Sequence, residues 1–218
     1  MAKNIFNETG VFVNPPSIPS FGNGGQVYNA DIFGGFNITD EKVNPLFTFR
    51  RGEGSVPNSE ALTNLREASK IGSTMEFVAT HVGIRIVKFG AAAALTPAEV
   101  QAAKSLIGSA LIDLSYGSNE TKIGEFSGLH FLSPVDVVAA AAEGTTTATP
   151  IAMNAGATPT GWIKLTTPIQ IQKNLNISGS VRFGSNVPAV LYDPNSTGTP
   201  QNIFGFVVML YGTKIVDA

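Results

Sequence analysis

The sequence contains no cysteine and few charged residues, and both absences exclude classes of protein. Without cysteine the chain can form no disulfide and no thiolate metal site. Charged residues make up 14% of its 218 residues, against about 25% in typical soluble domains. Because a surface this poor in charge favours association, we expect neighbouring subunits or proteins to cover much of it.

Long apolar runs, a leader sequence and basic blocks are also missing. Residues 206–210 form one of the longest apolar runs, which is far too short to cross a bilayer. The first ten residues lack the apolar core and cleavage site of a signal peptide. The net charge is −2, with no basic cluster, which argues against a dedicated nucleic-acid binder. A weak contact with phosphate or lipid headgroups stays open through a few scattered basic residues: Lys3, Arg50, Arg51, Arg66 and Lys70.

The motifs of common enzymes are absent as well. The sequence has no G-x-S-x-G elbow, no P-loop and no Rossmann fingerprint. His81 and His130 lie in expected strands, without partners at metal-ligand spacing. A carboxylate pair of Asp113 and Glu125 is the enzymatic alternative, since glycoside hydrolysis needs two carboxylates facing a cleft, but Trp162 is the only tryptophan. We therefore expect no enzymatic activity, catalytic residue, cofactor, metal or small-molecule substrate.

The most regular stretch is residues 162–183, where apolar and polar side chains alternate. A period of two indicates strands with one face on a core and the other in water. Pro168 and the Lys173-Asn174 pair are expected to divide this stretch into short strands. Further strands are predicted at residues 45–50, 75–89, 110–116, 122–132, 189–192 and 203–216.

Two helices are predicted between these strands. Asn58 is a candidate N-cap for a helix that would end near Gly72. Thr96, Pro97 and Glu99 form a capping box that opens a helix over residues 96–107. Residues 136–161 are rich in alanine, threonine and glycine and are expected to form a long loop. Eight to ten strands with helices only in connections predict an all-β sandwich, and the pattern fits a single jelly roll over residues 46–218.

Residues 1–45 are predicted to form an extended N-terminal arm. Proline and glycine are too dense there for long elements, yet large apolar residues recur between them. We expect such an arm to be ordered by lying across its own domain or a neighbour. Its candidate interface anchors are Phe6, Phe12, Phe21, Phe33 and Phe36.

The order of these segments resembles the jelly-roll capsid proteins of tailless bacterial viruses with an internal membrane. The resemblance covers about residues 74–216. It is carried by Ile123-Gly124-Glu125-Phe126 leading to Leu129-His130-Phe131, by Pro168-Ile169-Gln170-Ile171, and by the closing run from Phe206 to Tyr211-Gly212. Major coat proteins of this group often carry two jelly rolls, whereas ~170 residues beyond the arm hold only one.

The resemblance implies a structural coat subunit located in the virion after synthesis in the host cytoplasm. It implies a homo-oligomer, most simply a trimer, that contacts other coat proteins and an underlying membrane. The alternative is a jelly-roll receptor-binding or glycan-binding module of a virion or surface structure. Low charge, the arm and the absence of a convergent polar site favour the shell, because a lectin would show clustered exposed aromatics or an aspartate-rich calcium site.

Overall fold

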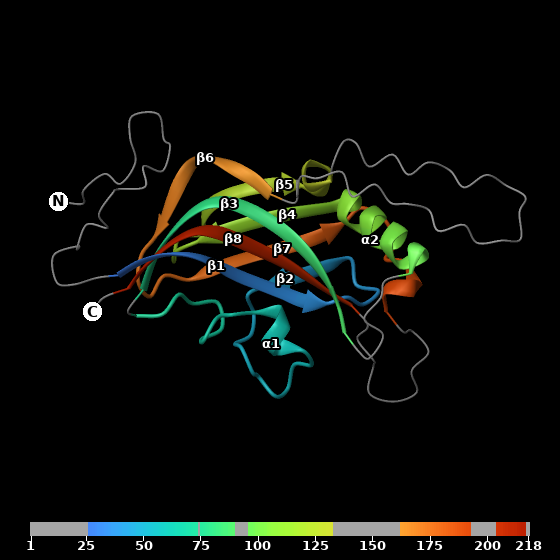
Figure 1. Ribbon diagram of the computed structural model, residues 1–218, viewed down its shortest axis with the longest axis horizontal. Helices are drawn as coiled ribbons and strands as arrows, with labels where there is room; N and C mark the ends of the chain where they lie inside the picture. The colour runs from blue at the N-terminus through green and yellow to red at the C-terminus, as the bar shows by residue number, and fades with distance from the viewer. Residues whose placement is uncertain (1–25, 74, 90–95, 133–161, 193–203, 217–218) are drawn as a thin grey trace, which may run out of the picture.

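The computed structural model describes residues 26–73, 75–89, 96–132, 162–192 and 204–216. Two four-stranded antiparallel sheets pack face to face (Figure 1), so the expected all-β sandwich is confirmed. The first sheet has the order β1 (Gln26–Asn37), β8 (Phe204–Val216), β3 (Met75–Lys88) and β6 (Trp162–Ile171). The second sheet has the order β2 (Val43–Leu46), β7 (Ile177–Phe183), β4 (Ala110–Tyr116) and β5 (Thr121–Ser127).

The strands pair in a nested pattern. β1 pairs with β8, β2 with β7, β3 with β6 and β4 with β5. Successive nested pairs fall in alternate sheets, and the pairings of β3 with β8 and of β4 with β7 complete each sheet. The arrangement is that of one long antiparallel ribbon wrapped around a common core.

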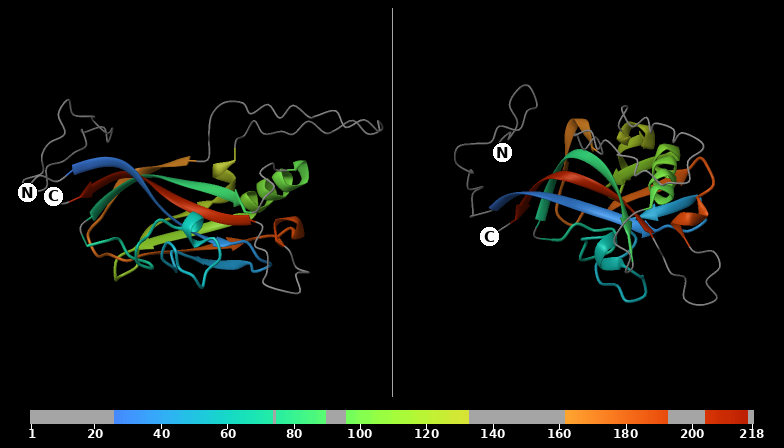
Figure 2. Two further views of the ribbon diagram at one scale, coloured as in Figure 1. Left: turned by 60° about the horizontal axis from the view of Figure 1, so that its bottom comes forward. Right: turned by 45° about the vertical axis from the view of Figure 1, so that its right-hand side comes forward.

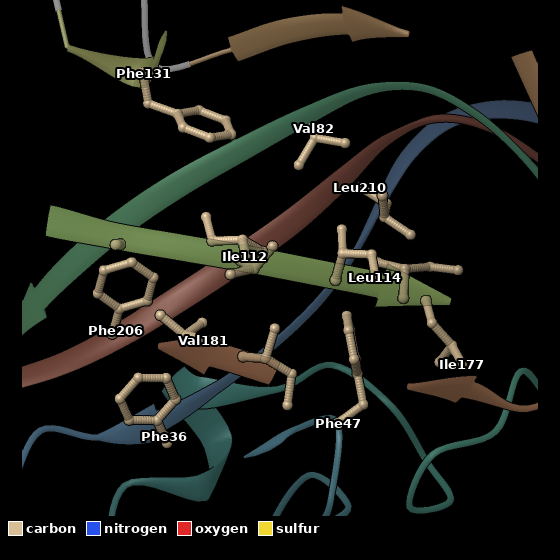
Figure 3. Close-up of a cluster of buried hydrophobic side chains, with 14 of the residues drawn as sticks. Phe36, Phe47, Val82, Ile112, Leu114, Phe131, Ile177, Val181, Phe206 and Leu210 are labelled. Carbon is tan, nitrogen blue, oxygen red and sulfur yellow. The ribbon is translucent and has the colours of Figure 1, made fainter. Parts of the chain in front are cut away.

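The core lies between the sheets and follows the period of two (Figure 3). Ile112 and Leu114 of β4 face Val181 of β7 on one side and Phe206 and Leu210 of β8 on the other, and all five side chains are buried. The predicted alternation over residues 162–183 is confirmed, because β6 and β7 contribute Leu165, Ile171, Ile177, Val181 and Phe183 to this core.

Strand β8 is apolar on both faces because both are covered. Phe206 and Val208 point into the core, while Val207 packs outward against Phe49 and Leu62 of the segment that follows β2. The strand lies between β1 and β3, as expected for a central strand.

The helix predicted from Asn58 to Gly72 is wrong beyond its first turn. Only α1 (Ser59–Leu62) forms, and Asn58 makes no side-chain cap. The next residues instead bind the free edge of β1. The Thr63 hydroxyl donates to the Phe33 carbonyl at 3.0 Å, and the Asn64 amide donates to the Asp31 carbonyl at 2.9 Å. Satisfying an edge strand outweighs continuing a short helix, because unpaired backbone groups are costly.

The capping box at Thr96 is confirmed. Helix α2 (Pro97–Ser109) has the Thr96 side chain accepting from the Glu99 amide, and the Glu99 carboxylate accepting from the Thr96 amide at 2.7 Å. Figure 2 shows α2 at one end of the sandwich, opposite the end where Gln26 pairs with Val216.

Several predicted boundaries need correction. The strand expected at residues 45–50 ends at Leu46, because Phe47 turns into the core with φ 62°. The strand expected at 122–132 ends at Ser127 and continues as a 3-10 turn, η1 (Gly128–Phe131). Residues 189–192 form a second 3-10 turn, η2 (Ala189–Leu191). Strand β6 passes through Pro168 unbroken, since an edge strand tolerates proline.

The expected arm is also too long at its C-terminal end. Residues 26–45 supply β1 and most of β2, so the sandwich begins well before residue 46. Residues 1–25 and the expected loop at 136–161 lie outside the described residues.

Candidate functional site

The candidate arm anchors serve different purposes in the structure. Phe36 is buried in the core of its own sandwich, where its ring stacks on Phe206 with centroids 5.6 Å apart. Phe33 packs against the outer cluster around Val207, and the Arg85 guanidinium lies 5.6 Å from its ring centroid. Phe36 therefore anchors β1 to its own domain and not to a neighbour, whereas a contact of the half-buried Phe33 with a neighbour stays a prediction. Phe6, Phe12 and Phe21 lie outside the described residues.

The strand that carries Phe33 and Phe36 was not predicted from the sequence, because glycines interrupt its apolar pattern. Ala30, Ile32, Gly34 and Phe36 alternate on the inward side of β1. A Cβ at Gly34 would lie 2.3 Å from the Phe47 ring, so the absent side chain makes room for an aromatic from another segment. If glycine is allowed at inward positions, the period of two continues through Gly34 and predicts β1.

The outer surface of the second sheet is rich in serine, and we call it the serine face. Its register places outward side chains of β2, β7, β4 and β5 next to one another, and they remain half-buried or exposed. The Ser115 and Ser178 hydroxyls lie 2.8 Å apart, and Val43 is 59% exposed. The serine face consists of Val43, Pro45, Leu111, Asp113, Ser115, Lys122, Glu125, Ser127, Ser178, Ser180 and Arg182.

The two carboxylates considered for catalysis do come together, but on this open surface. Asp113 and Glu125 are direct partners in the β4–β5 ladder. The Lys122 ammonium lies 3.2 Å from the Asp113 carboxylate and offsets its charge. A hydrolytic pair needs two carboxylates that flank the scissile bond of a bound sugar, and neither of these residues lines the cleft described below.

The two histidines differ in exposure and in their contacts. His130 is exposed in η1. His81 is half-buried in β3, and its Nδ1 lies 2.9 Å from the Thr80 hydroxyl. Partial burial lowers the pKa of His81, and the nearby positive charge of Lys164 lowers it further, so both effects favour the neutral ring. Within the described residues no group of three or more His, Asp or Glu side chains is placed to hold a metal ion.

A cleft of about 680 Å³ opens at the end of the sandwich where β1 begins. Its apolar walls include Ile32, Leu65 and Phe77. Arg66 and Lys70, two of the scattered basic residues, both line it. Its rim also carries Asp31, Glu67 and Lys214, and Lys70 lies 4.0 Å from Glu67. This mixture of charges does not single out an anionic ligand.

No family model matches this sequence, and the search of curated proteins found no match. Among the described helices, none has the length and apolar character needed to cross a membrane.

Proposed function

We propose that the sandwich is a jelly roll and that the protein is a structural coat subunit of a virus shell. The nested pairing of β1 with β8, β2 with β7, β3 with β6 and β4 with β5 carries this proposal. Wrapping such a ribbon into two sheets is how a jelly roll is built, and viral coat proteins are among the main users of that architecture.

Because many functions share this architecture, surface chemistry must support the choice. The serine face carries four outward serines, Ser115, Ser127, Ser178 and Ser180, beside the charged side chains of Asp113, Lys122, Glu125 and Arg182. Short side chains lose little conformational entropy on association, which suits a contact between subunits. As the resemblance implies, the proposed assembly is a homotrimer that packs with other coat proteins above a membrane. The low share of charged residues, 14% of the chain, is compatible with extensive contacts between subunits.

The serine face can be tested by placing long charged side chains on it. We expect the double substitution Ser178→Lys and Ser180→Lys to shift the purified protein from trimers or larger bodies toward monomers, because two long side chains would not fit into a contact made across short serine side chains. Light scattering coupled to size-exclusion chromatography measures the change. Ser185→Lys, an exposed substitution in the turn after β7, is the matched control and should leave the assembly unchanged.

Two outcomes would contradict the proposal. One is a strictly monomeric wild-type protein at high concentration with no particle in its natural source. The other is a double variant that assembles like the wild type, which would remove the serine face from the interface. Circular dichroism of the double variant shows that it still folds.

A further inference from the structure

Three aromatic rings from three neighbouring strands gather on the outer side of the first sheet. His81 comes from β3, Tyr211 from β8 and Trp162 from β6. The centroid of Tyr211 lies 6.2 Å from that of His81 and 5.7 Å from that of Trp162, with interplanar angles of 65° and 66°. Because Val82 and Leu210 point into the core, the side chains that alternate with them point outward. We call this group the aromatic cluster.

Two backbone features build the aromatic cluster. The registers of β3 with both neighbours shift between Ala79 and His81, so Thr80 is an extra residue in the strand. Such bulges re-aim side chains and recur beside functional sites. Gly83 lies under the indole of Trp162, and a Cβ there would come within 2.6 Å of that ring. The ring therefore lies against the backbone of β3, held in a defined orientation.

The hydrogen bonds of Thr80 set the tautomer of His81. The Thr80 hydroxyl has one hydrogen and donates it to the Tyr211 carbonyl at 3.1 Å. Its contact of 2.9 Å with His81 Nδ1 can form together with that bond only when Nδ1–H donates to the hydroxyl oxygen. In the neutral ring this leaves Nε2 as a bare acceptor. Lys164, opposite His81 in the ladder, is exposed and supplies a donor nearby.

This combination has the chemistry of a sugar-binding surface. A pyranose ring has an apolar C–H face that packs on an aromatic ring, and hydroxyl groups that need both donors and acceptors. Small-ligand sites generally combine aromatic surface with a few placed polar groups. The aromatic cluster presents Tyr211, 40% exposed, beside an indole, an imidazole acceptor and an ammonium donor.

We propose that the aromatic cluster is a glycan-binding site. A pyranose unit packs against Tyr211 and Trp162, and its hydroxyls bond to His81 Nε2 and the Lys164 ammonium. The site goes beyond the coat function and does not depend on it, because it lies on the first sheet while the proposed subunit contact lies on the second. In a coat subunit such a site would hold the glycans of a host surface.

Trp162 allows a direct test, because it is the only tryptophan in the chain. The probes are methyl glycosides and short oligosaccharides of glucose, galactose, mannose and N-acetylglucosamine, titrated to millimolar concentration into the full-length protein. We expect at least one probe to change the tryptophan emission with a saturable curve. Tyr211→Ala should weaken that binding about fivefold or more, the scale of one lost aromatic contact.

The matched control is Leu129→Ala, which also removes an exposed apolar side chain, 64% accessible, but in η1. It should bind the probe like the wild type. His81→Phe keeps a ring without Nε2 and should also weaken binding, which separates hydroxyl recognition from stacking. Thermal melting shows that each variant is folded.

Three results would overturn the proposal. They are an emission that no probe changes, binding that survives Tyr211→Ala, and an emission that changes on dilution in step with oligomer size. The last result would mean that a second copy covers the aromatic cluster. None of the three bears on assembly through the serine face, which light scattering measures separately.

Discussion

Lys88, the last residue of β3, donates to both carboxylate oxygens of Glu99 in the first turn of α2, at 2.9 and 3.0 Å. Both side chains are largely buried, and the Lys88 ammonium also lies 5.8 Å from the centroid of the Phe204 ring. The ion pair joins the helix to the first sheet at the end of the sandwich.

The Glu99 pair predicts a pH-dependent contribution to stability. The backbone hydrogen bond from Thr96 and the hydrogen bond from Lys88 lower the pKa of Glu99 from its ordinary value of 4.5. A carboxyl with a depressed pKa stabilises the fold above its unfolded pKa and loses that contribution as pH falls through the folded pKa. Glu99→Gln should therefore unfold at lower urea concentration than the wild type at neutral pH, with the difference closing in acid.

The control for that measurement is Glu60→Gln, an exposed carboxylate in the first turn of α1. Its urea midpoint should follow the wild type more closely at both pH values. A Glu99→Gln deficit that persists unchanged at acid pH would show that packing, and not charge, explains the effect.

The side-chain amide of Asn64 binds the edge of β1, and we expect its removal to destabilise the fold. Asn64 accepts from the Phe33 amide and donates to the Asp31 carbonyl, both at 2.9 Å. Asn64→Ala should lower the free energy of unfolding by about 1–3 kcal/mol, because partly buried backbone groups lose their partners. Faster hydrogen exchange at the Phe33 amide would locate the loss. Asn119→Ala, in the exposed turn after β4, should have little effect.

We expect β1 to tolerate no side chain at position 35, where the sequence has glycine. A Cβ there would lie 2.3 Å from the Phe206 carbonyl oxygen in the adjacent strand. Gly35→Ala should destabilise the protein by about 1–3 kcal/mol, since the backbone of β1 must shift. Gly54→Ala is the control, because nothing lies within 4 Å of its added Cβ. Equal urea midpoints for the two variants would contradict the observed packing of β1 on β8.

Two truncated chains distinguish the contribution of residues 1–25 from that of β1. A chain beginning at residue 26 keeps β1 and should melt cooperatively, near the wild-type temperature. A chain beginning at residue 38 exposes the edge of β8 and loses Ile32 and Phe36 from the core. We expect that shorter chain to aggregate or melt well below the wild type. If both truncated chains melt alike, β1 does not contribute to the folded domain.

The same pair of truncations tests the tether role kept for residues 1–25. If these residues tie a subunit to its neighbour, the chain beginning at residue 26 should fold but form smaller assemblies by light scattering. Assembly indistinguishable from that of the full chain would leave Phe6, Phe12 and Phe21 without a role as interface anchors.

Local sequence determined the parts of this protein whose signals are local. Thr96 and Glu99 lie three residues apart and satisfy each other's backbone amides, so the start of α2 needs no tertiary partner. The alternation in β6 and β7 follows from a strand's period of two, which put their apolar side chains on the core.

Only the tertiary structure decided the elements that depend on distant partners. β1 is a strand because Gly34 and Gly35 admit Phe47 and the backbone of β8, and the chain after Leu62 leaves the helix to satisfy the edge of β1. The aromatic cluster joins His81, Trp162 and Tyr211 across three strands of the first sheet. No local pattern marks such positions, because strand register, and not spacing along the chain, sets which side chains meet.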